Sequence, residues 1–150
     1  MEARYEERQI AWYLIIIFDS IFLLMLLAYV YEWGDHPISL VGLSIYTIIY
    51  LSIAALFYQM KTQVFADKII VSFGIGWIKK TISIKKLESV EQVRNKWYYG
   101  WGIKIIKNGM LYNINGLDAV ELKFKNKKAV VRIGSQHSTR LKSEIEYLIK

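Results

Sequence analysis

The sequence predicts a membrane α-hairpin of two transmembrane helices followed by an α+β domain of about ninety residues. Lys and Arg are absent between Ile10 and Met60, whereas eighteen of the twenty lie after Met60. This segregation is hard to obtain in a globular core, whose elements alternate polar and apolar faces. From Lys61 onward, by contrast, apolar and polar residues alternate, as in half-buried strands. We therefore divide the chain into an N-terminal segment (1–9), a first transmembrane helix (10–33), a turn (34–37), a second transmembrane helix (38–60) and a domain (61–150).

The two apolar segments are long enough to cross a bilayer. Residues 10–33 would span about 36 Å as a helix, at about 1.5 Å per residue, against a hydrocarbon core of about 30 Å. Residues 38–60 are of comparable length, and the Gly-Asp-His-Pro sequence of 34–37 predicts a tight turn, because Gly and Pro break helices. A cleavable signal peptide is the rival interpretation of the first segment. We disfavour it because the apolar stretch is too long and no small-x-small cleavage site follows.

Basic residues lie at the outer ends of this hairpin. Arg4 and Arg8 precede the first span, Lys61 and Lys68 follow the second, and the turn carries neither Lys nor Arg. The positive-inside rule then predicts a multi-pass protein of the cell (inner) membrane, with an extracytoplasmic turn and both termini cytoplasmic. Aromatic residues that favour the headgroup region lie near the expected span ends: Trp12, Tyr13, Tyr29, Tyr31, Trp33 and Tyr58.

Asp19 is the one acid well inside a span. It lies roughly 14 Å from the cytoplasmic end of its helix, where a charge costs at least a few kcal/mol. The second helix offers Thr47, Tyr50 and Ser52 at similar depth. We favour a hydrogen-bonded strut or a homo-oligomer contact, with Asp19 and Ser52 as candidate intramembrane contacts. The alternative is a proton or ion site, or a contact with a partner's helix.

The domain shows a strand pattern and one helical stripe. Period-two alternation occurs at 69–74, 81–85, 120–125 and 129–133, and Asn108-Gly109 is a strong hairpin signal. Leu141, Ile145 and Leu148 form an apolar stripe along an expected helix over 138–149. Six or seven short strands and one amphipathic helix predict a small barrel or sandwich that the helix closes.

Four segments of the domain, taken in order, resemble a known family. They are Tyr-Gly-Trp-Gly-Ile-Lys at 99–104, Tyr-Asn-Ile with a following glycine at 112–116, Ala-Val-Glu-Leu at 119–122 and Ile-Gly-Ser at 133–135. Residues 62–150 thereby resemble the bacterial pleckstrin-homology-like (PH-like) domains, which are often attached to a two-helix membrane hairpin. The resemblance implies a bent antiparallel sheet of about seven strands with a C-terminal helix, and a binding or assembly platform without a defined chemistry.

The domain is strongly basic. Beyond Met60 it carries eighteen Lys or Arg against seven Asp or Glu, a balance of +11. Nucleic-acid binding is one interpretation, since a mixture such as Arg94, Lys96 and Trp97 can stack bases. We expect no nucleic-acid partner, because a domain tethered to the inner leaflet meets anionic lipid first and its basic character also follows from topology.

Residues 96–102 are the most unusual stretch of the domain, with four aromatic residues between basic residues and glycines. We take Lys96, Trp97, Tyr98 and Trp101 as a candidate partner or lipid surface. A packing interpretation competes with it, and we favour that interpretation: Trp97, Tyr99 and Trp101 alternate into the core, and the glycines allow a bulge.

Nothing in the sequence indicates a reaction centre. The Gly-x-Gly pairs at 74–76 and 100–102 lack the rest of a dinucleotide fingerprint. His36 and His137 lie on opposite predicted sides of the membrane, and there is no cysteine. We therefore expect no enzyme activity, no metal and no cofactor.

The leading functional hypothesis is a non-enzymatic, membrane-anchored binding or scaffold module at the inner leaflet. Its expected partners are the lipid bilayer, a membrane protein or a second copy of the chain. The alternative is self-protection (immunity) against membrane-active bacteriocin peptides, since some two-span proteins with such a domain resemble immunity proteins. An oligomeric ion or proton pathway through Asp19 is disfavoured, because two spans need oligomerisation to enclose a pore.

Overall fold

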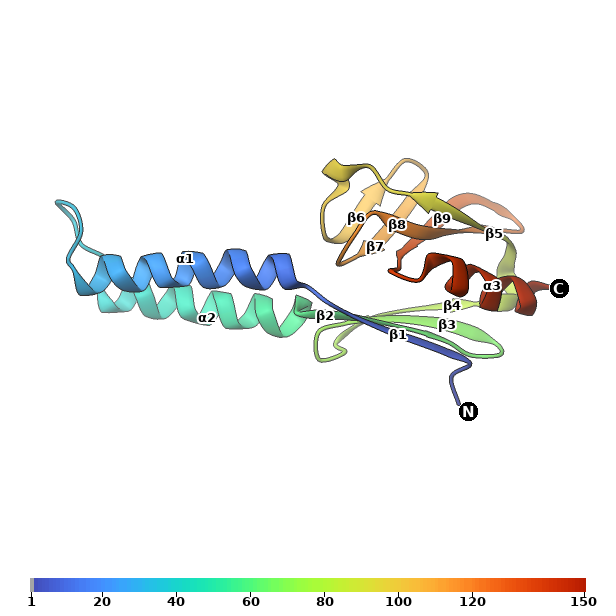
Figure 1. Ribbon diagram of the computed structural model, residues 1–150, viewed down its shortest axis with the longest axis horizontal. Helices are drawn as coiled ribbons and strands as arrows, with labels where there is room; N and C mark the ends of the chain where they lie inside the picture. Colours follow the sequence, from blue (N-terminus) through green and yellow to red (C-terminus); the bar gives the residue numbers. More distant parts are fainter. Residues whose placement is uncertain (1) are drawn as a thin grey trace.

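The computed structural model describes residues 2–150 and separates a helical hairpin from a two-sheet domain (Figure 1). Helices α1 (Trp12–Val30) and α2 (Leu40–Phe57) are both long and apolar enough to cross a membrane. Neither apolar stretch is buried inside the protein, and the helices extend away from the domain as an antiparallel pair. Such a large exposed apolar surface is typical of a membrane-associated chain.

The described residues contain nine strands in two sheets. The first sheet has the order β1-β2-β3-β4 and the second β5-β8-β9-β7-β6. The first comprises β1 (Tyr5–Ile10), β2 (Gln59–Val64), β3 (Lys68–Phe73) and β4 (Ile78–Ser83). The second comprises β5 (Leu87–Arg94), β6 (Gly102–Ile106), β7 (Gly109–Asn113), β8 (Asp118–Phe124) and β9 (Lys127–Gly134).

Helix α3 (Ser138–Ile149) matches the helix expected over 138–149. It packs against β5, β8 and the short 3-10 turn η1 (Ile84–Lys86), between the two sheets and away from the hairpin (Figure 1). Leu141 and Ile145 of its apolar stripe are fully buried, together with Met60, Phe73 and Ile133 from the sheets. The expected organisation of two helices, β-structure and a closing C-terminal helix is confirmed at this level.

The strand arrangement differs from the expected antiparallel sheet of about seven strands. An additional strand, β1, comes from the N-terminal segment, and β7 and β9 pair in parallel. The parallel pair arises because β9 folds back from β8 and then lies between β8 and β7. Gly109 permits the close contact, since a Cβ there would lie 1.9 Å from the carbonyl oxygen of Val130.

Strand β1 ties the start of the chain into the domain. It pairs antiparallel with β2 from Tyr5 opposite Val64 to Ile10 opposite Gln59. Its inward-facing residues are Tyr5, Glu7 and Gln9, two of which are polar, so no apolar alternation marks the strand in the sequence.

One residue joins each helix to a strand of the first sheet. Ala11 lies between β1 and α1, and Tyr58 lies between α2 and β2. The backbone N–H of Ala11 donates a hydrogen bond to the carbonyl oxygen of Tyr58 (2.9 Å), and Ala11 is buried. The paired helices therefore continue directly into paired strands, without a flexible linker.

Candidate functional site

A polar contact between the two helices joins Asp19 of α1 to Tyr50 of α2, whose hydroxyl donates a hydrogen bond to the Asp19 carboxyl group. The ring of Tyr50 also stacks on Phe18 and Phe22, with centroids 6.1 and 5.8 Å apart. Ser52, the other candidate intramembrane contact, instead donates to the carbonyl oxygen of Ile48 in its own helix (2.8 Å). The geometry is that of a strut between the two helices, while the Asp19 side chain remains exposed on the hairpin surface.

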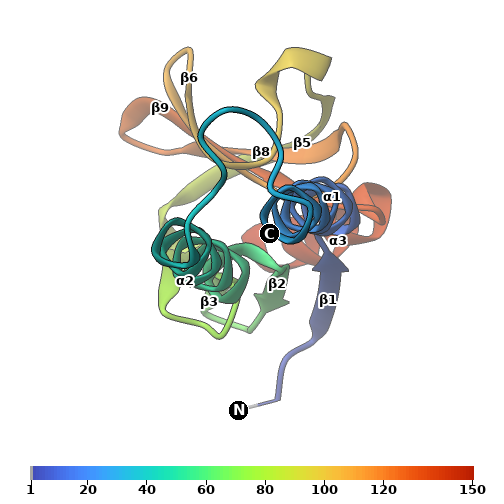
Figure 2. The same ribbon diagram turned by 90° about the vertical axis from the view of Figure 1, so that its left-hand side faces the viewer.

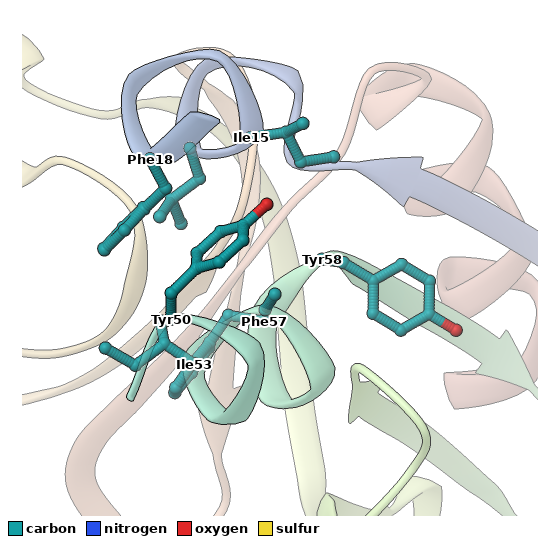
Figure 3. A pocket seen from close by; sticks show the side chains of 8 residues that line it. Ile15, Phe18, Tyr50, Ile53, Phe57 and Tyr58 are labelled. Carbon is teal, nitrogen blue, oxygen red and sulfur yellow. The ribbon is translucent and has the colours of Figure 1, made fainter. Parts of the chain in front are cut away.

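A small cavity lies between the helices next to this contact. Its volume is about 20 Å³, and Figure 3 shows the Tyr50 ring pointing from α2 toward α1 across it. That volume holds about one water molecule, so the cavity is too small for an organic ligand. Its lining is almost entirely apolar: Leu14, Ile15, Phe18, Tyr50, Ile53, Ala54, Phe57 and Tyr58.

The Asp19–Tyr50 strut gives a testable stability effect. Tyr50→Phe keeps the ring and removes the donor, and it should lower the free energy of helix association by about 1 kcal/mol. Tyr46→Phe is the matched control, because the Tyr46 hydroxyl is buried without a hydrogen-bond partner among the described residues. Titration of the full chain from mild detergent into SDS measures both variants. An equal loss from the two would contradict the strut.

The aromatic stretch at 96–102 forms an exposed loop, not a core-facing strand. Residues Trp97–Tyr99 form the 3-10 turn η2, and Gly100 has a φ of +63°, so the alternation needed for packing is broken. Trp97 is 81% exposed and Tyr98 58% exposed. The packing interpretation of this stretch is therefore wrong, and Trp97 and Tyr98 lie on the protein surface.

Lys96 belongs to the same surface, whereas Trp101 does not. The ammonium group of Lys96 lies 5.5 Å from the Tyr98 ring centroid, and a hydrogen bond with that phenol raises the pKa of Lys96. Trp101 turns toward the hairpin and stacks on Tyr13 in the first turn of α1, with centroids 5.6 Å apart and planes 9° apart. Asn113 donates from Nδ2 to the carbonyl oxygen of Gly100 (3.2 Å), which helps to hold the loop. The four predicted residues thus fall into two groups. Lys96, Trp97 and Tyr98 are exposed at the tip of the loop, whereas Trp101 packs on Tyr13 at its base.

A second exposed loop, the β3–β4 turn, was not predicted as a site. Its residues Ile75 and Trp77 are 54% and 79% exposed. The backbone N–H of Ile75 donates to the carbonyl oxygen of Ala55 in the last turn of α2 (3.1 Å). The sequence signal for this loop was a pair of apolar residues, Ile75 and Trp77, next to glycines and shortly after the second predicted transmembrane segment.

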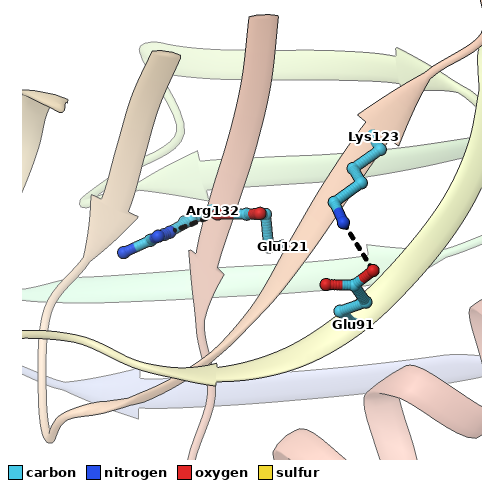
Figure 4. A network of polar contacts seen from close by, with 4 residues as sticks. All are labelled: Glu91, Glu121, Lys123 and Arg132. Carbon is cyan, nitrogen blue, oxygen red and sulfur yellow. Dashed lines mark hydrogen bonds and ion pairs between the residues drawn. The ribbon is translucent and has the colours of Figure 1, made fainter. Parts of the chain in front are cut away.

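Two ion pairs link charged side chains of the second sheet. Arg132 Nε lies 2.6 Å from Glu121 Oε2, and Lys123 pairs with Glu91, which raises the pKa of Lys123 through their hydrogen bond (Figure 4). Within residues 2–150, no group of three or more His, Asp or Glu side chains is placed to hold a metal ion. These pairs are typical of a solvated sheet face and not of an acid–base site.

The buried acid of the domain is Glu7 in β1. Its carboxylate accepts hydrogen bonds from the Tyr5 hydroxyl (2.6 Å), the Ser135 hydroxyl (2.6 Å) and the Gln136 backbone N–H (2.8 Å). Burial raises the pKa of Tyr5, and the Glu7 carboxylate raises it further, so the phenol stays protonated as a donor. Glu7 therefore links the first sheet to the segment between β9 and α3 in a structural role.

A scan against protein-family models finds no match to the sequence, and a search among curated proteins finds no significant match.

Proposed function

We propose that the protein is a non-enzymatic binding or scaffold module, anchored in the cell membrane by α1 and α2 with both termini cytoplasmic. Its two-sheet domain is a PH-like domain held at the inner leaflet. The order of sequence motifs and the closing C-terminal helix support this assignment. The basic balance of the domain supports the orientation, as does the absence of Lys and Arg from the turn between the helices.

The observation that carries the proposal is the direct continuity between helices and strands. Ala11 and Tyr58 are the sole joining residues, and they are hydrogen-bonded to each other. A domain on a flexible linker samples many orientations, whereas this domain has a fixed orientation relative to the hairpin axis. A fixed orientation presents the same surface to every partner that moves in the plane of the membrane, as a scaffold requires.

Loss of the rigid attachment should therefore weaken partner binding at least about tenfold, which corresponds to about 1.4 kcal/mol. A short Gly-Ser insertion after Ile10 and a second after Tyr58 would uncouple the domain while leaving both sheets intact. The same insertion in the exposed turn after Gly34 is the matched control. Full-length protein would be cross-linked in its native membranes and purified in mild detergent, with mass spectrometry of the stoichiometric products.

We expect the wild type and the turn insertion to give the same cross-linked partner or second copy, and the junction insertions to give at least about tenfold less, equivalent to about 1.4 kcal/mol. Thermal melts of all variants would confirm that the domain is folded. Recovery of no stoichiometric partner by the wild type would refute the protein-scaffold function. Equal recovery from the junction insertions would show that the fixed orientation is not used.

A further inference from the structure

Two loops expose large apolar side chains at the end of the domain nearest the hairpin. The first, residues 74–77, presents Ile75 and Trp77, and the second, residues 96–99, presents Trp97 and Tyr98. In Figure 1 both loops lie close to the level at which α1 and α2 meet the domain. The view along the helices in Figure 2 places them on opposite sides of the hairpin.

Contacts with the helix ends fix the level of both loops. The Ile75 N–H donates a hydrogen bond to the carbonyl oxygen of Ala55, two residues before the end of α2. The backbone of this loop therefore lies beside the last turn of α2, about 3 Å along the helix axis from its end. On the other side, Trp101 at the base of the second loop stacks on Tyr13, one residue inside the start of α1. If the two helices span the bilayer, both loops therefore lie in the layer where the hydrocarbon gives way to headgroups.

The composition of the loops matches that layer. Trp and Tyr favour the membrane–water interface, where an apolar ring and a polar edge are both accommodated. Basic side chains accompany each loop: Lys79 lies over Gly76 in the first, and the Lys96 ammonium lies over the Tyr98 ring in the second. Lys residues at this depth extend their ammonium groups to anionic headgroups.

We propose that the 74–77 and 96–99 loops insert into the headgroup layer of an anionic bilayer on either side of the hairpin and hold this end of the domain against the membrane. The proposal rests on the membrane anchoring in the proposed function and adds the lipid surface as the ligand of these loops. The aromatic residues of the loops would then bind the same bilayer that the two helices cross. A protein partner on the same loops is the competing outcome that the experiment separates.

Because the chain has no cysteine, single labels report the depth of each loop in the full-length protein. Trp77→Cys and Trp97→Cys would each carry an environment-sensitive fluorophore. The protein would be reconstituted in vesicles of equal parts phosphatidylcholine and phosphatidylglycerol, with nitroxide-labelled lipids as quenchers. Tyr147→Cys is the matched control, since Tyr147 is 65% exposed in the last turn of α3. Figure 1 shows that this helix lies away from the hairpin.

We expect headgroup-level nitroxides to quench the labels at 77 and 97 several-fold more strongly than the label at 147. Quenching at 77 and 97 should weaken in vesicles of phosphatidylcholine alone, because the lysines then lose their anionic ligands. Equal quenching at all three positions would overturn the proposal. So would labels at 77 and 97 that become shielded only when a cross-linked protein partner is present.

A fourth label separates failure of the inference from failure of the anchoring. Ile21, in the middle of α1 and exposed on the hairpin, would carry it as Ile21→Cys. Strong quenching at 21 by nitroxides deep in the acyl chains shows that the hairpin is inserted. If 21 is quenched and the loops are not, only the loop insertion fails; if 21 is not quenched, the membrane-anchored function fails with it.

Discussion

Glu7→Ala is expected to lower the free energy of unfolding of the domain by about 3–5 kcal/mol. The substitution removes the acceptor of three hydrogen bonds, and each buried donor left without a partner costs about 1–3 kcal/mol. Glu7 is 8% exposed and its donors come from β1 and from the segment that leads into α3. Both the sheet and the position of α3 therefore depend on this one carboxylate.

Glu6→Ala is the matched control, because Glu6 is the preceding residue of the same strand and faces solvent. Its carboxylate pairs with Lys61 at 3.0 Å, an exposed ion pair that lowers the pKa of Glu6 and contributes less than about 1 kcal/mol. Thermal unfolding of full-length protein in mild detergent, followed by near-UV circular dichroism, compares the two. We expect a Tm decrease of more than about 10 °C for Glu7→Ala and less than about 5 °C for Glu6→Ala. Similar decreases would show that the buried network is not what holds β1.

The elements that the sequence predicted well are those whose pattern reflects burial directly. Continuous apolar runs predicted α1 and α2, and the stripe through Leu141 and Ile145 predicted α3 within the bounds that the structure shows. The Asn108-Gly109 signal likewise predicted the β6–β7 hairpin, in which Asn108 has a positive φ of 66°. In each case a local property of the chain decides the structure.

Strand β1 was missed because its burial is not apolar. Glu7 and Gln9 face inward. The Glu7 carboxylate accepts hydrogen bonds from Ser135 and Gln136, and Gln9 Nε2 donates one to the Gly134 carbonyl oxygen, all more than a hundred residues away. A period-two search scores such residues as solvent-facing, so the segment looked like a polar N-terminal tail. The parallel pairing of β7 and β9 was missed for a related reason, since strand order depends on long-range packing.

The candidate sites were predicted in part. Asp19 does contact a residue of the second span, but sequence depth alone could not choose Tyr50 over Ser52. The aromatic segment was identified from its composition, yet the exposure of Trp97 and the stacking of Trp101 on Tyr13 depend on a turn that breaks the alternation. Trp77 alone did not indicate a site in the sequence. Its position suggests one only because the structure places the β3–β4 turn next to the end of α2.

Gly74→Ala is expected to lower the free energy of unfolding by about 3–5 kcal/mol, since it disrupts the contact between that turn and α2. A Cβ on Gly74 would lie 2.0 Å from the carbonyl oxygen of Ala55 and 2.5 Å from that of Leu56, so backbone must move, and its φ of +53° adds strain. Gly116→Ala isolates the strain, because Gly116 has a φ of +75° and open space around it; we expect about 1–2 kcal/mol there. Thermal melts measure both losses, and equal values would mean that the turn does not pack against the helix.

The displacement of the β3–β4 turn by Gly74→Ala should also move Ile75 and Trp77 away from the headgroup level. We therefore expect Gly74→Ala to weaken lipid quenching of a label at 77 while leaving the quenching of a label at 97 unchanged.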